Sequence, residues 1–164
     1  MKHGLIIAGT GHRPNKLGGY SEDIYTELIK LASMCIEKYK PSQIISGMAL
    51  GWDQALSEAA IQYNIPLTAA IPFINQESKW PKLSQEKYKN ILSRSTKIIT
   101  SEGGYSACKM QLRNQWMVEN CDAILALWDG SSSGTANCIE YANKLNRKVI
   151  NIWPVWELMR SKIV

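Results

Sequence analysis

The chain has 164 residues, of which 45% are hydrophobic and 20% are charged. This length is typical of one domain, and the composition excludes a disordered chain, which has fewer apolar and more charged residues. No apolar run approaches the about 18 residues of a membrane-spanning helix, and the run Leu5–Ala8 is too short for a secretory signal. We therefore expect a single domain over 1–164, in the cytoplasm, with no membrane partner.

The chain carries a modest positive charge, because 19 Lys and Arg residues outnumber 14 Asp and Glu residues and give a formal net charge of +5. This excess suits an anionic ligand. The basic residues are scattered, which disfavours a nucleic-acid surface. The cysteines lack the C-x-x-C spacing of a zinc site, so we expect no metal, no other cofactor and no disulfide framework. They are Cys35, Cys108, Cys121 and Cys138.

Apolar runs typical of strands alternate with stretches of helical period along the chain. In chain order, the pattern predicts a strand Leu5–Thr10, a helix 21–39 capped by Ser21, a strand Gln43–Ser46, a helix 52–63, a strand Pro66–Ile71, a helix Ser84–Leu92, a strand Lys97–Thr100, a helix 106–120, a strand Ala123–Trp128, a helix 134–145, and a strand Val149–Trp153 before a short tail. Strands separated by helices indicate a Rossmann-like, doubly wound α/β domain with a mainly parallel sheet. In such sheets ligands bind outside the carboxyl ends of the strands, so the loops there hold the candidate site.

The first strand ends in a glycine turn followed by a basic residue. Glycines let the backbone approach a ligand closely, and free amides with an arginine hold phosphate. The segment is neither the dinucleotide fingerprint, because Pro14 stands where glycine is needed, nor a P-loop. A tight turn with a surface arginine is the alternative. The candidate residues are Gly9, Thr10, Gly11, His12 and Arg13.

The second strand ends in a segment with two glycines, followed by a helix. Its backbone amides are suited to face an anion. Asp53 either caps this helix or accepts a hydrogen bond from a hydroxyl or amine of a ligand. The candidate residues are Ser46, Gly47, Gly51 and Asp53.

The fifth strand ends in a serine- and glycine-rich turn that leads into a helix. Such a turn offers hydroxyls and free amides at the positive end of a helix dipole, which is suited to a phosphate group. A plain connecting loop is the alternative. The candidate residues are Asp129, Ser131, Ser132, Ser133, Gly134 and Thr135.

These three loops together resemble the YpsA-like branch of the SLOG superfamily. The segments are Gly9–Arg13, Ile45–Asp53 and Ser131–Ala136, and the resemblance continues through Phe73, Gln76, Trp80, Tyr88, Arg113-Asn114 and Met117-Val118. The superfamily includes the LOG phosphoribohydrolases and the Rossmann domain of DprA. The resemblance implies a Rossmann-like fold that binds a nucleotide or a nucleotide-derived ligand. It also implies self-association, so we expect a homo-oligomer.

A comparison with the LOG enzymes bears on catalysis. The segment Met110–Met117 matches their Met-x-x-Arg-x-x-x-Met helix, and Ser131–Thr135 resembles their glycine-rich turn. Cys138, however, stands where those enzymes carry a glutamate. Glycosidic cleavage needs a carboxylate, so we expect a binder without catalytic residues rather than an enzyme. The alternatives are an N-glycosidic nucleotide hydrolase using Asp53, Glu58 or Asp129, and a DprA-like nucleic-acid-binding module.

For a binder, we expect Arg13 and the serine-rich turn to hold phosphate, and Arg113 to supply a second positive group. Substitution of Arg113 by alanine should then weaken binding and leave the fold intact. Trp80 or Trp128 is a candidate to stack on a base, with a place in the core as the alternative. If a phage encodes the protein, the domain would sequester a host signalling nucleotide.

Overall fold

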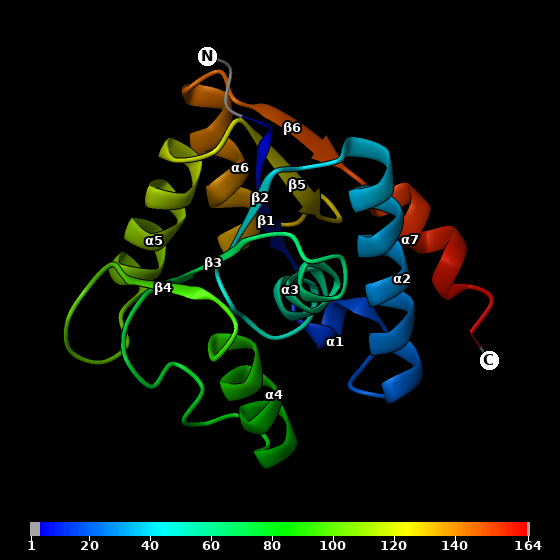
Figure 1. Cartoon of the computed structure of the whole chain (residues 1–164), viewed down its shortest axis with the longest axis horizontal. Helices are drawn as coiled ribbons and strands as arrows, with labels where there is room; N and C mark the ends of the chain where they lie inside the picture. Colours follow the sequence, from blue (N-terminus) through cyan, green and yellow to red (C-terminus); the bar gives the residue numbers. More distant parts are fainter. Residues whose placement is uncertain (1–3, 164) are drawn as a thin grey trace.

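The computed structural model describes residues 4–163 and contains one six-stranded sheet (Figure 1). The strand order is β4-β3-β2-β1-β5-β6, and every neighbouring pair is parallel. The strands are β1 (Ile6–Gly11), β2 (Gln43–Ser46), β3 (Leu67–Ile71), β4 (Thr96–Ile99), β5 (Ala123–Leu127) and β6 (Lys148–Asn151). The predicted Rossmann-like α/β fold with a parallel sheet is confirmed.

Helices cover both faces of the sheet (Figure 1). The helices are α1 (Pro14–Leu17), α2 (Glu22–Tyr39), α3 (Trp52–Gln62), α4 (Lys82–Leu92), α5 (Ala107–Glu119), α6 (Gly134–Lys144) and α7 (Trp153–Arg160). Side chains of α2, α3, α4 and α7 pack into one hydrophobic core, whereas α5 and α6 build the other. Within the described residues 4–163, no helix is both long enough and apolar enough to cross a membrane.

Consecutive strand residues feed opposite cores, as the alternation of side chains along a strand requires. In β1, Ile7 packs into the core of α2 and α3 and Ala8 into that of α5 and α6. Every residue of β3 and β5 is buried, whereas most of the edge strand β4 is exposed. Because helices cover both faces of the central strands, both sets of alternating side chains are buried. The sequences of these strands are therefore continuous apolar runs.

Two helices of the structure were not predicted. Helix α1 begins at Pro14 and has a proline in its first turn, as does α7, where Pro154 follows Trp153. Trp153 thus begins a helix, whereas the sequence pattern placed it in the last strand. Proline at the start of a helix is favourable because its missing N–H has no partner there in any case.

The order of the strands reverses between β1 and β5. After β1 the chain moves outward through β2, β3 and β4, and then returns to place β5 on the other side of β1. The loops after β1 and β5 therefore diverge to opposite faces of the sheet. Such a switch point opens a crevice at the carboxyl edge, which positions the candidate site.

Candidate functional site

A cleft of about 680 Å³ lies at the carboxyl ends of β1 and β5. This volume is within the about 300–1,000 Å³ of typical small-molecule sites. The side chains and backbone that line it come from the end of β1 and the loop after it, from α1, from the β2–α3 loop and α3, from the β4–α5 loop and α5, and from the start of α6. The lining residues are Thr10, Gly11, His12, Arg13, Asn15, Lys16, Ala49, Asp53, Tyr105, Ala107, Met110, Gln111, Arg113, Asn114, Met117, Ser133, Gly134, Thr135 and Asn137.

The loop after β1 is pressed against the start of α3. Gly51 has a φ of +89°, and a Cβ on it would lie 2.7 Å from the His12 carbonyl oxygen. A Cβ on Gly11 would lie 2.6 Å from a ring carbon of Trp52, which is fully buried. These two glycines let the loop after β1 pack directly against the start of α3. The packing fixes the positions of Gly11 and His12, which line the cleft.

The start of α6 presents its free amides to the cleft. The Ser133 hydroxyl caps the helix by accepting a hydrogen bond from the Ala136 amide at 3.1 Å. Gly134 and Thr135, the first two residues of the helix, line the cleft. Amides in the first turn lack partners within the helix and lie at the positive end of its dipole, so this part of the cleft is suited to an anion.

Arg113 lines the cleft from α5, but it also joins the elements around it. Its side chain is buried, and Nη1 donates to the Gly47 carbonyl oxygen at 2.6 Å while Nε donates to Asn114 Oδ1 at 3.0 Å. A Cβ on Gly47 would lie 2.7 Å from Nη1, so the guanidinium fills the space above this glycine. The expectation that alanine at this position leaves the fold intact is therefore corrected, because the substitution removes a buried contact between α5 and the β2 loop.

Asp53 is the only acidic side chain among the described residues that line the cleft. Its Oδ2 accepts a hydrogen bond from the Ala49 amide at 3.2 Å, whereas Oδ1 is buried without a hydrogen-bond partner. Burial raises the pKa of Asp53 to about 6, against the lowering effect of nearby Arg113. The carboxyl group thus has one buried oxygen without a hydrogen-bond partner and a pKa above its ordinary value.

A network of polar side chains links the loop after β1 with the loop after β5. Nε2 of buried His12 lies 2.8 Å from Asp129 Oδ1, which also accepts hydrogen bonds from the Ser131 amide and hydroxyl. Lys16 of α1 donates to the Ser131 hydroxyl at 2.6 Å. The hydrogen bonds from Ser131 and the contact with His12 hold the pKa of Asp129 well below its usual range. These contacts tie together the two loops that diverge at the switch point.

The structure brings nine of the predicted site residues into the lining of the cleft, which are Thr10, Gly11, His12, Arg13, Asp53, Arg113, Ser133, Gly134 and Thr135. Eight others are not among the lining residues, which are Gly9, Ser46, Gly47, Gly51, Trp80, Asp129, Ser131 and Ser132. Ser46, for example, is buried and its hydroxyl donates to the Asp53 carbonyl oxygen. Gly47 and Asp129 likewise contact the lining residues Arg113 and His12, so part of this second group supports the cleft from behind.

The two tryptophans considered for base stacking have other partners. The ring of Trp80 packs edge-on against Tyr88, with 5.3 Å between the ring centroids. The Trp128 indole donates to the Ser131 carbonyl oxygen at 2.8 Å. Neither residue is in the cleft lining, whereas Tyr105, which sequence reasoning missed, is. A glycine pair before Tyr105, at 103 and 104, was the available signal of an exposed loop.

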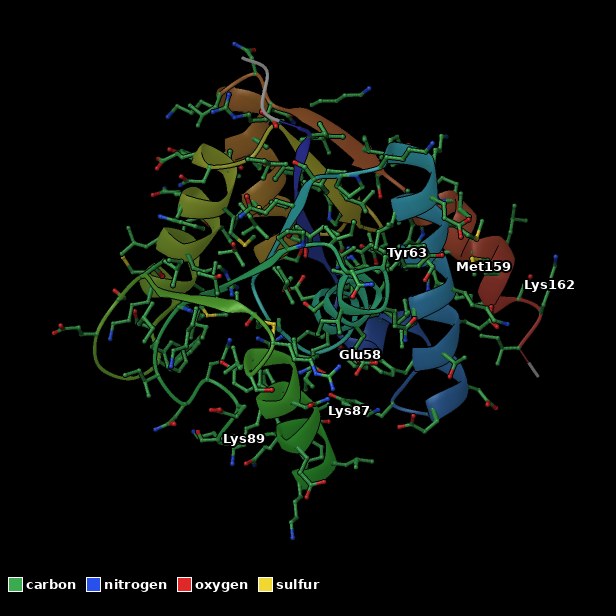
Figure 2. The ribbon with its side chains drawn as sticks, viewed as in Figure 1. Glu58, Tyr63, Lys87, Lys89, Met159 and Lys162 are labelled. Atoms are coloured by element: carbon green, nitrogen blue, oxygen red, sulfur yellow. The ribbon has the colours of Figure 1, made fainter. Side chains whose placement is uncertain are left out.

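The structure also separates the candidate catalytic groups. Cys138 is fully buried, and burial raises the pKa of its thiol to about 12, so the reactive thiolate is strongly disfavoured. Glu58 lies on α3 near Lys87 of α4 (Figure 2), and its charge acts on Tyr25 of α2, away from the cleft lining. Among residues 4–163, no group of three or more His, Cys, Asp or Glu side chains is arranged to hold a metal ion.

The sequence profile of the YpsA family, described as the YspA SLOG family, matches residues 7–154. The chain belongs to this family. The predicted resemblance is thereby confirmed, and the match includes β1 from Ile7 onward, the other five strands and the whole cleft lining of this YspA SLOG protein.

Two bacterial relatives match most of the chain. The uncharacterized SPbeta prophage-derived protein YoqJ of Bacillus subtilis (strain 168) is 33% identical over 135 residues, which are 72% of this chain and 79% of the relative. A UPF0398 protein of Bacillus cereus (strain AH820) is 29% identical over 158 residues, which are 89% of this chain and 86% of the relative.

Solved structures share the fold of this YspA SLOG protein. DNA processing protein A (DprA) from Streptococcus pneumoniae has a TM-score of 0.65 at 20% identity, with 88% of this chain covered but only 49% of DprA, so the chain spans about half its length. The molybdenum cofactor carrier protein from Chlamydomonas reinhardtii has a TM-score of 0.59 at 15% identity, with 97% of this chain and 84% of that protein covered. At such identities the likeness shows the fold alone.

Proposed function

We propose that the protein binds a nucleotide or nucleotide-derived phosphate ligand in the cleft at the switch point. The observation that carries this proposal is the convergence of Arg13, Lys16 and Arg113 on the same cleft as the start of α6, against the single carboxyl group of Asp53. Family membership supports it, because SLOG proteins generally bind nucleotide-derived ligands.

The phosphate would lie at the first turn of α6. The amides of Gly134 and Thr135 offer hydrogen-bond donors there, and Arg13 is exposed at the cleft rim, where its guanidinium is free to close on an anion. The Ser131 hydroxyl is engaged with Asp129 and Lys16, so it supports this turn rather than contacting the phosphate.

Asp53 would recognise a hydrogen-bond donor on the same ligand. Its unpaired Oδ1 is a buried acceptor, and leaving such an atom unsatisfied costs about 1–3 kcal/mol. A ribose hydroxyl or an amino group of a base that donates to this oxygen would recover that energy on binding. A nucleotide carries both a phosphate and such donors.

The test is calorimetric titration of the full chain with mono-, di- and cyclic nucleotides and ADP-ribose, with thermal stability measured in parallel. A ligand present at 100 times its Kd should stabilise the fold by about 2.7 kcal/mol. Arg13→Ala should weaken binding about 10- to 150-fold, as expected for one charge-assisted hydrogen bond. The matched control is Arg94→Ala, because Arg94 is exposed and outside the cleft lining. Failure of every compound to bind would refute the proposal.

The properties of Asp53 favour one second candidate, an N-glycosidic nucleotide hydrolase. A carboxyl group of a lining residue that has a pKa of about 6 and one oxygen without a hydrogen-bond partner is suited to general acid–base catalysis. Asp129 is a poor substitute, because its pKa is held well below the usual range. We nevertheless expect little or no turnover, because the position of the LOG glutamate holds the buried Cys138.

Chromatographic detection of free base and ribose 5-phosphate decides between binding and hydrolysis. Multiple turnovers that disappear in Asp53→Asn would favour the hydrolase. Activity that appears only in Cys138→Glu would instead support a binding cleft that lacks the catalytic carboxylate.

The cellular role is a further part of the proposal. We propose that the domain senses a signalling nucleotide or, if a phage encodes it, sequesters one, and the prophage-derived relative supports the second setting. A homo-oligomer and a cytoplasmic location stay predictions, which light scattering and cell fractionation test. Tighter binding of single-stranded oligonucleotides than of mononucleotides would favour the DprA-like alternative.

A further inference from the structure

Tyr105 lies in the loop between β4 and α5 and lines the cleft. It is 73% exposed, more than any other large hydrophobic residue in the described range 4–163. Exposure of an aromatic ring gives up the stabilisation that burial of its apolar surface would provide. Burial in the core therefore does not account for an aromatic residue at this position.

The backbone around Tyr105 is nevertheless fixed by its neighbours. The Ser106 hydroxyl caps α5 by accepting a hydrogen bond from the Lys109 amide at 3.1 Å, and Lys109 Nζ donates to the Gly104 carbonyl oxygen at 2.7 Å. The Tyr105 ring meets Phe73 nearly at a right angle, with 6.1 Å between the centroids. A single perpendicular contact occupies at most one face of the tyrosine ring, so at least one face is free for a ligand.

The cleft lining has two chemically different parts. Its aromatic wall consists of Tyr105, Ala107, Met110 and Met117, which belong to α5 and the loop before it. Its polar wall consists of the buried residues His12, Asp53, Arg113 and Thr135. Methionine thioethers pack favourably on aromatic rings, so these apolar side chains are suited to a flat, unsaturated ring, and Arg113 of the same helix adds a positive charge to the lining.

We infer that Tyr105 is the stacking platform for the base of the ligand, and hence that the natural ligand carries an aromatic base and is not a plain sugar phosphate. This inference rests on the proposed nucleotide-binding function. The phosphate occupies the first turn of α6, and the base lies on the aromatic wall with one face against Tyr105.

The test compares AMP, GMP, CMP and UMP with ribose 5-phosphate, which has the same sugar and phosphate without a base. When alanine replaces an aromatic residue on which one base stacks, the Kd rises about 5- to 150-fold. At least one nucleotide should bind the unchanged protein more tightly than ribose 5-phosphate by about this factor. Tyr105→Ala should remove that advantage and leave ribose 5-phosphate binding unchanged, whereas Tyr105→Phe, which keeps the ring, should retain it.

The matched control is Tyr20→Ala, because Tyr20 is also highly exposed and lies outside the cleft lining. Equal affinity of ribose 5-phosphate and all four nucleotides would overturn the stacking inference and leave phosphate binding in place. Nucleotide binding that is insensitive to Tyr105→Ala would also overturn it. Absence of binding by all five compounds would overturn the inference in this form, and it would overturn the proposed function as well if the di- and cyclic nucleotides and ADP-ribose also fail to bind.

Discussion

The polar wall of the cleft is buried and tightly bonded, whereas the aromatic wall includes the most exposed large hydrophobic residue among the described ones. His12, Arg113 and Asp53 each have hydrogen-bond partners in other parts of the chain. Tyr105 has one edge-on ring contact and belongs to the loop that follows β4, the exposed edge strand. The two walls therefore differ in how firmly they are held before a ligand arrives.

This difference follows from the chemistry of each wall. A buried charge or polar group is stable only where its partners are fixed, so the polar wall is preorganised by the fold. An aromatic ring has no such requirement and stacks on rings of different size and substitution. The polar wall is therefore suited to the sugar and phosphate, which nucleotides have in common. The aromatic wall is suited to the base, which differs between nucleotides.

The largest expected effect comes from removing the charge at the centre of the polar wall. Arg113→Met should destabilise the fold by about 3–5 kcal/mol, because it leaves the Asp53 carboxyl group without its neighbouring cation and the Gly47 carbonyl oxygen without its donor. Urea unfolding at pH 8 measures the change. In a double-mutant cycle, Asp53→Asn should recover part of the loss, and strictly additive effects would show that the two side chains are not coupled.

The second prediction tests whether backbone packing fixes the polar wall. Gly51→Ala should cost about 2–4 kcal/mol, because the position combines a φ of +89° with a Cβ that would collide with the His12 carbonyl oxygen. Thermal unfolding measures the loss. Gly104→Ala is the control, since a Cβ there meets nothing within 4 Å. Equal effects of the two substitutions would contradict the close approach.

The third prediction concerns pH. The folded pKa of Asp53, about 6, is above the ordinary value of 3.8, so the folded chain binds the proton more tightly than the unfolded chain. The protonated Asp53 therefore contributes its full share of the free energy of unfolding below pH 4, and this contribution is lost as the pH rises through about 6. The free energy of unfolding of Asp53→Asn, relative to the unchanged protein, should rise by about 2–3 kcal/mol over this range. A difference that stays constant with pH would contradict the raised pKa.

The smallest effect is expected in the loop that supports the polar wall. Asp129 has a depressed pKa, so it contributes stability above the unfolded pKa, and this contribution is lost as the pH falls through the folded value. Ser131→Ala removes one donor and should raise the carboxyl pKa, which NMR titration measures. It should also reduce the free energy of unfolding near neutral pH by about 1 kcal/mol, as for one hydrogen bond, and this difference should disappear in acid, where Asp129 is protonated. Ser132→Ala, at the exposed neighbour, should change neither quantity.

The sequence predicted the sheet well because the buried strands β1, β3 and β5 are short apolar runs between turns. The two missed helices have weaker signals. Helix α1 has only four residues, and α7 begins with an aromatic residue and a proline directly after the last strand. Periodicity needs several turns to be recognised, so proline at a helix start was the better signal in both cases.

The sequence predicted those site residues that directly follow the ends of parallel strands. It did not predict the residues that reach the cleft from loops distant in sequence. The carboxyl-end rule found His12, Asp53 and Thr135, since it needs only the positions of parallel strands. It could not place Tyr105, whose approach to the cleft depends on the return of the β4–α5 loop. Nor could it show that Arg113 would be buried against Gly47, a contact between residues 66 positions apart in sequence.

One contact behind the polar wall has a practical consequence. The Trp153 ring lies edge-on to His12 with 5.8 Å between the centroids, and Arg160 is 5.1 Å from the same indole. Indole emission responds to the charge and polarity of its surroundings, and His12 lines the cleft. We therefore expect the intrinsic fluorescence of Trp153 to change when a ligand occupies the cleft. Comparison with Trp153→Phe would separate its signal from those of the other five of the six tryptophans of the chain.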